Sequence, residues 1–415
     1  MNMLYNIGIQ IFNILVYIAS PFNPKAGQWI RGRKNWQELL GKKIRPDEKH
    51  VWIHCASLGE FEQGRPVIEA IREKMPDHKI VLSFFSPSGY EVRKDYRHAD
   101  CICYLPADTP SNARRFIAML NPEFAIFVKY EFWNNYLSVL HRKGIPLYLI
   151  SGIFRPGQHF FRWYGSFSRG ILAKFTHFFV QNEQSVELLG SLGLKNVTLA
   201  GDTRFDRVVQ IAGAAKDIPQ IVKFRGEEML FLAGSSWADD EAIITEYINK
   251  YPGRMKWVFA PHETDRANIS RLEKLIKVKT VRFSEFTDAS ADSRVLIIDG
   301  MGVLSSAYRY AHMAAIGGGF GRGIHNVLEA AAWDIPVLFG PNHERFREAV
   351  DLLKLGGAMT FRDQPGFESI LERWTGDENL YRDAAEAAGN YVRENTGATR
   401  RIMASITPED INTKH

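Results

Sequence analysis

Two glutamates follow predicted buried strands, where a carboxylate can take part in proton transfer. Glu60 ends the segment Ala-Ser-Leu-Gly-Glu after a strand predicted at 51–57, and Glu131 follows a strand predicted at 124–129. A carboxylate in a cleft is a ready general base. Near a helix N-terminus the same group is stabilised as an anion, so a purely electrostatic role is an equal alternative for Glu60. We expect Gly59 to allow a tight turn before it.

A cation, Arg204, follows another strand, predicted at 197–202. Its guanidinium could pair with a phosphate or carboxylate of a ligand. The alternative is a surface ion pair with Asp202 or Asp206.

Five glycines stand within seven residues between an apolar run at 313–316 and a buried strand predicted at 335–339. A helix is predicted at 326–333. A strand, a glycine loop and a helix N-terminus together offer backbone N–H groups to a phosphate. The spacing fits neither the dinucleotide-binding nor the P-loop pattern, which disfavours both readings. Tight packing in an ordinary α/β fold is the alternative explanation of these glycines, which are Gly317, Gly318, Gly319, Gly321 and Gly323.

Short apolar runs alternate with helical patterns from residue 50 onward. This predicts parallel strands that are covered by helices on both faces. We therefore predict an α/β fold of two Rossmann-like, doubly wound domains that face a cleft. Ligands of such sheets bind beyond the carboxyl ends of the strands, so polar residues just after strands are site candidates. The strands are predicted at 51–57, 79–85, 101–106, 124–129, 147–152, 177–182 and 197–202 in the first half, and at 229–235, 256–261, 295–300, 313–318 and 335–340 in the second.

The domain boundaries are predicted from the polar stretch at 210–227 and from the ends of the strand pattern. We expect an N-terminal domain, a C-terminal domain, an apolar segment before them and a helical tail after them. Their predicted ranges are 23–215, 225–385, 1–22 and 386–415, respectively.

Composition and charge indicate a globular protein of ordinary make-up. The 415 residues carry a net charge of +5, which does not by itself indicate a nucleic-acid partner but suits work beside anionic lipid. Three cysteines fit a reducing compartment better than a disulfide framework. We expect Cys101 and Cys103 to pack in a core. The sequence carries no signal for an oligomeric state.

The apolar segment at 3–22 is long enough to span a bilayer, which takes about 20 residues. Its polar residues recur at helical spacing and leave one polar stripe. Positive charge follows the segment, which disfavours a secretory signal and predicts a cytoplasmic remainder. A membrane anchor or interfacial helix is the favoured reading, with a cleaved signal and a buried helix as alternatives, and we expect the domains to fold without it. The basic residues are Lys25, Arg31, Arg33 and Lys34.

Eight motifs occur in order along the chain and together resemble the 3-deoxy-D-manno-octulosonic acid (Kdo) transferase family. That family glycosylates the lipid A precursor from CMP-Kdo. The motifs are ASLGE (56–60), SPSGY (86–90), YLPAD (104–108), YEFWNN (130–135), GDTRFD (201–206), APHE (260–263), GMG (300–302) and GGGFGRGIHNVLEAAAWDIPVLFGP (317–341).

The resemblance implies a GT-B fold, an N-terminal membrane helix and a catalytic glutamate at Glu60. Glu131 and Arg204 are implied to orient or stabilise the transition state. His262 and Val303 stand where the family has arginine and glutamate, and Val327 replaces a proline. The implied CMP-binding residues are Pro261, His262, Met301, Gly302, Val303, Gly318, Gly319, Asn326, Val327, Leu328 and Glu329.

The implied reaction is an inverting, metal-independent transfer of Kdo from the co-substrate CMP-Kdo to a lipid A precursor at the cytoplasmic face of the inner membrane. The absence of an Asp-x-Asp motif and the monophosphate leaving group favour chemistry without a metal or cofactor. The alternatives are another GT-B enzyme, a UDP-sugar transferase or epimerase, and a non-catalytic nucleotide-binding scaffold in which Glu60 is only structural.

Overall fold

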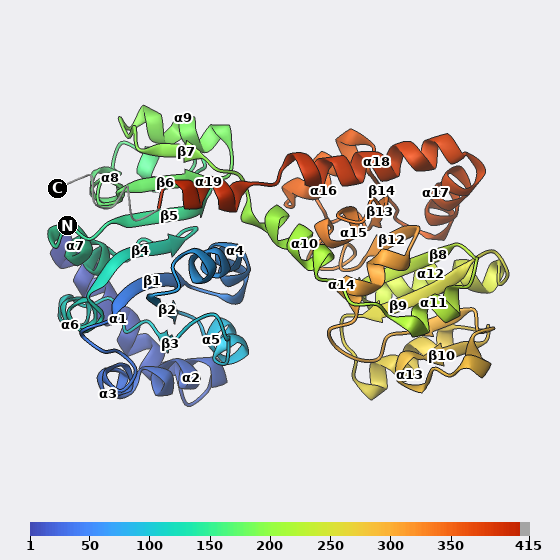
Figure 1. Ribbon diagram of the computed structural model, residues 1–415, viewed down its shortest axis with the longest axis horizontal. Coiled ribbons are helices and arrows are strands. Elements are labelled where there is room, and N and C mark those ends of the chain that lie inside the picture. Colours follow the sequence, from blue (N-terminus) through green and yellow to red (C-terminus); the bar gives the residue numbers. More distant parts are fainter. Residues whose placement is uncertain (407–415) are drawn as a thin grey trace. The chain divides into compact units, whose positions relative to one another are not determined.

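The computed structural model describes residues 1–406, which form two α/β units (Figure 1). The first unit runs from Met1 to Arg207 and resumes at Thr396, and the second comprises Val208–Asn395. The sequence placed the corresponding boundaries at 215–225 and at 385/386.

The first unit is built on a seven-stranded sheet in the order β3-β2-β1-β4-β5-β6-β7, and all its strands are parallel. This doubly wound order confirms the predicted fold class for this unit. The strands are β1 (Lys49–Cys55), β2 (His78–Phe84), β3 (Cys101–Tyr104), β4 (Pro122–Val128), β5 (Leu147–Gly152), β6 (His177–Val180) and β7 (Val197–Leu199).

Alternate residues of β1 explain why its apolar run is continuous. Val51 and Ile53 pack into the core on one face of the sheet, and Trp52 packs into the core on the other. A strand covered on both faces therefore shows a nearly continuous apolar run rather than an alternating pattern. The covering and connecting helices are α1 (Asn2–Ala19), α2 (Pro24–Arg33), α3 (Trp36–Gly41), α4 (Leu58–Lys74), α5 (Pro87–Arg93), α6 (Pro110–Leu120), α7 (Asn134–Arg142), η1 (His159–Phe161), α8 (Ser166–Leu172) and α9 (Glu183–Ser191).

The second unit repeats this architecture with the strand order β10-β11-β9-β8-β12-β13-β14, again all parallel. Two outermost strands, β10 and β14, were not predicted, because each has three residues and no buried apolar run. The strands are β8 (Leu230–Ser236), β9 (Lys256–Pro261), β10 (Thr280–Arg282), β11 (Val295–Ile297), β12 (Met313–Ile316), β13 (Val337–Phe339) and β14 (Ala358–Thr360).

Helices enclose this second sheet and lead into and out of the unit. Helix α10 (Thr203–Gly213) carries the chain across the boundary at Arg207. The others are α11 (Pro219–Arg225), α12 (Ala238–Lys250), α13 (Arg266–Leu275), η2 (Phe283–Glu285), η3 (Asp288–Ser290), α14 (Leu304–Ala307), η4 (Tyr308–Tyr310), α15 (Leu328–Ala331), α16 (Arg347–Leu355), α17 (Gln364–Gly376) and α18 (Glu378–Glu394).

The last helix, α19 (Ala398–Ala404), lies in the first unit, where it packs against α4 (red in Figure 1). Ile402, Met403 and Ile406 are buried in the same core as Val51 and Ile53 of β1. The first unit is therefore assembled from both ends of the chain.

Helix α1 lies on the first unit, and its N-terminal end is beside α7 (Figure 1). No residue of α1 is buried, which excludes the reading of a core helix. Asn6 of the predicted polar stripe faces the protein and accepts a hydrogen bond from Asn135, whereas Gln10 of the same stripe is exposed. Tyr5, beside Asn6, donates a hydrogen bond to Asp108. The opposite side exposes a row of large apolar residues, Leu4, Ile7, Ile11, Ile14, Leu15 and Ile18.

Candidate functional site

Glu60 lies in the first turn of α4, at the carboxyl end of β1. The Ser57 hydroxyl donates to its carboxylate at 2.7 Å. Burial raises the pKa of Glu60, and the negative charge of Glu131 raises it further, against the opposing effect of Ser57. A raised pKa suits a carboxylate that must accept a proton near neutral pH.

The tight turn expected at Gly59 is wrong, because this residue is already inside α4. A Cβ placed there would meet only the Ser57 hydroxyl, at 4.0 Å. Gly59 therefore leaves open space next to Glu60, which leaves room for a ligand to approach the carboxylate.

Helix α5 and the residue before it contact residues 56–57, which precede the helical turn that carries Glu60. The Ser86 N–H donates to the Ala56 carbonyl at 2.7 Å. A Cβ on Gly89 would lie 2.4 Å from the Phe84 ring and 3.2 Å from the Ser57 backbone, so glycine permits the close packing of α5. This contact gives the Ser-Pro-Ser-Gly-Tyr motif a structural role.

Glu131, after β4, is held by two side chains. The Trp133 indole donates to its carboxylate at 2.5 Å, and His54 Nε2 lies 3.3 Å from the same oxygen. His54 is fully buried in β1, and its Nδ1 lies 3.1 Å from the Ser83 carbonyl oxygen. Nδ1 also lies 2.9 Å from the Ser83 hydroxyl, so Ser83 of β2 holds the imidazole ring that contacts Glu131.

The structure thus brings Glu60 and Glu131 into electrostatic contact within the first unit. It also adds His54 and Ser83, which sequence reasoning missed. The available signal was a pair of polar residues, His54 in β1 and Ser83 in β2, each directly after the buried apolar run of its strand.

Backbone strain marks the strand exits of both units. Lys129 after β4, Ser151 in β5 and Ser235 in β8 have φ of 69°, 54° and 49°. A left-handed conformation at a residue other than glycine costs about 1–3 kcal/mol and is concentrated at functional sites. This strain supports the strand ends as the place where ligands bind.

Arg204, at the start of α10, forms the ion pair that was the alternative to a ligand contact. Its guanidinium contacts the Asp202 carboxylate at 2.8 Å. Asp206 accepts from the N–H groups of Gly397 and Thr399, at 2.5 and 2.6 Å, and so holds the start of α19. The Gly-Asp-Thr-Arg-Phe-Asp motif therefore links α10 to the returning chain.

The glycine loop of the second unit is packed tightly against backbone. A Cβ on Gly319 would lie 2.5 Å from Gly340, and one on Gly317 would lie 2.2 Å from the Ser235 carbonyl. The Gly318 N–H donates to the buried carboxylate of Asp240 at 2.9 Å, so it is already paired. Burial raises the pKa of Asp240 to about 6. Close packing accounts for Gly317 and Gly319, and Asp240 is a loop-holding residue that the sequence did not reveal.

The helix predicted at 326–333 is shorter in the structure, where α15 has four residues. Asn326 accepts from the Leu328 N–H at 3.2 Å and donates to Glu329 at 3.2 Å. Ser305 donates to the other oxygen of Glu329 at 2.8 Å. Val327 and Leu328 are fully buried, so Asn326 and Glu329 are the members of this motif that a ligand could reach.

Through Ser305, the segment after β12 meets α14, which follows the loop that carries Met301, Gly302 and Val303. Met301 is 88% exposed, and Gly302 has a φ of 85°. The structure therefore places Glu329 against α14, the helix that follows residues 301–303, within the second unit.

His262 follows Pro261, the last residue of β9, and belongs to a cluster of three stacked rings. Its ring stacks on Trp237 at 4.6 Å and on His325 at 4.5 Å. Burial lowers the pKa of His325, as does the neighbouring His262. Trp237 and His325 were not predicted as site residues. They do follow β8 and β12, and residues after the carboxyl ends of strands are where ligands of such sheets bind.

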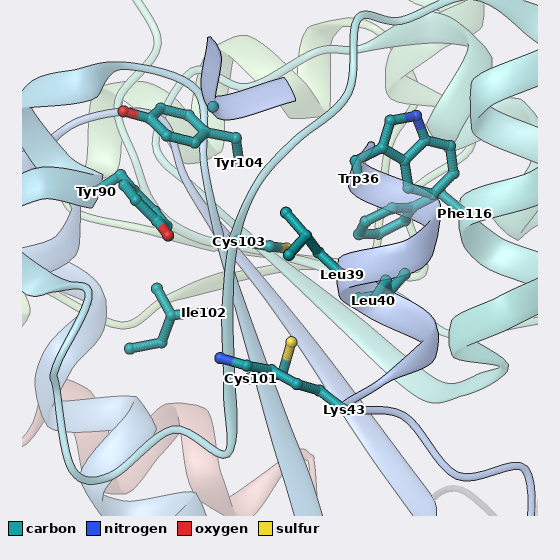
Figure 2. Close-up of a pocket in the computed structure, with 11 residues that line it drawn as sticks. Trp36, Leu39, Leu40, Lys43, Tyr90, Cys101, Ile102, Cys103, Tyr104 and Phe116 are labelled. Carbon is teal, nitrogen blue, oxygen red and sulfur yellow. The ribbon is translucent and has the colours of Figure 1, made fainter. Parts of the chain in front are cut away.

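A small pocket lies elsewhere in the first unit, between α3 and β3 (Figure 2). It is lined by Cys101 and Cys103 together with Trp36, Leu40 and Phe116, and no predicted site residue contributes to it. Both cysteines pack against the core, as predicted. Within residues 1–406, no three His, Cys, Asp or Glu side chains come together as a set of metal ligands.

Comparison with known proteins identifies relatives over most of the chain. The family model of 3-deoxy-D-manno-octulosonic-acid transferase (kdotransferase) matches residues 34–207. The Kdo transferase of Aquifex aeolicus is 29% identical over 74% of this chain and 80% of its own length. That of Haemophilus influenzae is 23% identical over 89% of both chains. The chain is a homologue of the Kdo transferases. The resemblance seen in the motifs is thereby confirmed, and with it the expectation of an enzyme, a glycosyltransferase.

Solved structures place the Kdo transferase homologue in a known fold. The UDP-GlcNAc 2-epimerase of Neisseria meningitidis has a TM-score of 0.61 at 15% identity and covers 86% of this chain and 99% of its own. A glycosyltransferase of Rickettsia africae has a TM-score of 0.56 at 11% identity, covering 88% and 100%. At these identities the likeness concerns the fold alone, and it confirms the expected GT-B architecture.

Proposed function

We propose that the protein transfers Kdo from CMP-Kdo to a lipid A precursor, with inversion and with Glu60 as the general base. Glu60 takes the proton of the acceptor hydroxyl as that oxygen attacks the anomeric carbon. The bond from this carbon to the phosphate oxygen breaks, and CMP leaves with the electron pair. The observation that carries the proposal is the partly buried Glu60 carboxylate beside Glu131, with open space at Gly59, in a homologue of the Kdo transferases.

The second unit is the proposed donor site. Its strand-end residues Asn326, Glu329 and His262 are polar groups that could contact ribose, base or phosphate. Because His262 replaces an arginine of the family pattern, we propose that its imidazole takes part in holding the phosphate. Exposed Met301 and the 301–303 backbone border the same motif.

The deciding experiment supplies the purified full chain with a lipid A precursor and either CMP-Kdo or UDP-sugars. We expect CMP release and a product heavier by Kdo only with CMP-Kdo. Transfer or epimerisation of a UDP-sugar would instead establish the other GT-B function. Nucleotide binding without any turnover would leave a scaffold role.

The reaction is expected to need no metal ion. The leaving group is a monophosphate, whose charge backbone N–H groups and one or two cations can stabilise. Transfer rates in excess EDTA should match those of untreated enzyme. A loss of activity that Mg²⁺ restores would contradict this account.

Helix α1 is proposed to bind the cytoplasmic surface of the inner membrane. It has 18 residues with a mean hydropathy of 1.3, which alone is a weak signal. Its isoleucines at 7, 11, 14 and 18 form one exposed stripe while the opposite side bonds to the first unit, as an interfacial helix requires. Lys25, Arg31 and Lys34 are exposed and can attract anionic headgroups, whereas Arg33 is buried and donates to the Leu105 carbonyl.

Replacing Ile11 and Ile18 by serine should weaken binding to anionic vesicles at least tenfold. Each buried isoleucine contributes about 1.5–3 kcal/mol on transfer from water, and tenfold corresponds to about 1.4 kcal/mol. Cosedimentation with vesicles measures the effect. Leu39→Ser, an equally exposed change in α3, is the control. Unchanged binding by the double variant would remove α1 from the membrane contact.

A further inference from the structure

The loop between β4 and α7 carries Glu131, and two separate sets of contacts connect it to α1. One set acts at Asn134 and Asn135, where α7 begins, and the other reaches Trp133. All these residues belong to the first unit.

The first set consists of hydrogen bonds made by Tyr5 and Asn6 of α1. The Tyr5 hydroxyl donates to Asp108 at 2.6 Å and accepts from the Asn134 N–H at 3.2 Å. Asn6 accepts from the Asn135 side chain at 2.9 Å. Asp108, only 2% exposed, also accepts from the Asn135 and Tyr136 N–H groups at 3.0 Å each. Tyr5 and Asp108 thus cap the first turn of α7 together.

The second set is a chain of aromatic contacts. Phe12 of α1 packs against Phe85 with ring centroids 6.1 Å apart. Phe85 stacks on Trp133 at 4.8 Å, and Trp133 donates to the Glu131 carboxylate. A continuous path of touching side chains therefore joins α1 to this carboxylate.

The hydrogen bonds are not what membrane binding requires. A helix that only held the protein at a lipid surface would need its exposed apolar side, and its inner side could be of any composition that packs. Here the inner side places Asn6 and a phenol on the loop of Glu131. Breaking these half-buried hydrogen bonds would leave polar groups without a partner, which costs free energy. The bonds therefore hold the loop that carries Glu131 in one arrangement.

We infer that α1 is also a positioning element of the acceptor site, in which Tyr5 and Asn6 hold the loop that places Glu131 beside Glu60. This inference rests on the proposed transfer reaction. Membrane attachment and loop geometry are then served by opposite sides of one helix, and a change on either side should affect one property only.

The pKa of Glu60 provides a measurement that a mere loss of protein stability would not change. The groups that act on its carboxylate are Glu131, His54 and the Ser57 hydroxyl, and Tyr130 lies close enough to sense its charge. The charge of Glu131 raises the pKa of Glu60. If Glu131 moves away, the pKa of Glu60 falls, and the acid limb of the activity profile moves to lower pH.

The test compares full-length Tyr5→Phe/Asn6→Ala with Ile11→Ser/Ile18→Ser in detergent micelles, where recruitment to a membrane does not limit the rate. For the inner-side variant we expect a kcat lower by roughly tenfold, an unchanged KM for CMP-Kdo, an acid limb at lower pH and normal vesicle binding. For the outer-side variant we expect normal kcat in micelles and weak vesicle binding.

Hydrogen exchange separates this inference from the proposed reaction. Amides of 134–136 should exchange faster in the inner-side variant than in wild type, whatever the substrate is. Unchanged exchange overturns the inference, as does faster exchange with a wild-type kcat and pH profile. Failure of the wild-type chain to use CMP-Kdo would instead overturn the proposed function.

Discussion

Glu60→Gln is expected to lower kcat by a factor of roughly 100 or more, which corresponds to about 2.7 kcal/mol of transition-state stabilisation. Glutamine keeps the size of the side chain and can still accept from the Ser57 hydroxyl, so the fold and CMP affinity should be retained. What it loses is the ability to take a proton from the acceptor hydroxyl. Single-turnover transfer from CMP-Kdo measures the effect.

Glu73→Gln is the matched control, because Glu73 is an exposed carboxylate of the same helix. In the wild type, activity should fall on the acid side as Glu60 becomes protonated. Because the pKa of Glu60 is raised by burial, this fall should come at a higher pH than for an exposed carboxylate. Near-normal turnover of Glu60→Gln would remove this residue from the mechanism.

Gly319→Ala should destabilise the second unit by about 3 kcal/mol or more, because the added methyl group has no place to go. Its Cβ would lie 2.5 Å from the Gly340 nitrogen and 2.6 Å from the Gly340 Cα, both backbone atoms. Relief requires the backbone at Gly319, after β12, to move away from the backbone at Gly340, after β13. Urea unfolding should show a lower midpoint, and CMP binding should weaken in parallel.

Gly321→Ala provides the comparison within the same loop. The nearest atom to its Cβ is the Gly318 carbonyl oxygen at 3.8 Å, an ordinary contact. The free energy of unfolding of this variant should lie within about 0.5–1 kcal/mol of the wild-type value. Equal destabilisation by both variants would show that the loop needs flexibility rather than close packing.

The strands were the most predictable part of the fold, because a parallel strand that is covered on both faces carries a nearly continuous apolar run. Of the segments predicted around β1 and β4, both lie within two residues of the observed bounds. Edge strands β10 and β14 carry no such constraint and were missed. The segment from β2 to α5 could be recognised as a motif, but the reason for its glycine, the close approach of Gly89 to Phe84 and Ser57, is visible only in the structure.

The positions of Glu60 and Glu131 at strand ends were predictable, because each residue follows an apolar run that forms a buried strand, and their catalytic roles stay predictions. The role of His54 could not be predicted, because it depends on a contact with Glu131, 77 positions later in the chain. The role of Asp240 could not be predicted for the same reason, because its carboxylate bonds to the glycine loop 78 positions later. Pattern along a chain reports burial and turns, whereas pairing between distant polar groups depends on the fold itself.

Helix α1 had been expected to be dispensable for folding of the first unit, because the sheet is complete without it. The sheet is indeed complete, yet the loop at Asn134 and Asn135 is bonded to α1. A chain that starts near Pro24 would leave Asp108 with one donor fewer. Loss of activity on truncation is therefore no measure of membrane attachment alone.

The position of α19 bears on how the protein is made. Ribosomal synthesis delivers residues 1–207 first, but Ile402, Met403 and Ile406 of the same core emerge only after the entire second unit. The core of the first unit therefore stays incomplete, without the α19 side chains that pack against α4, until about 190 more residues are translated, which takes roughly 10–40 s. A nascent chain that stops before residue 396 would carry a finished second unit and an unfinished first one, so premature termination near the end of the gene would damage the half of the protein that was synthesised earliest.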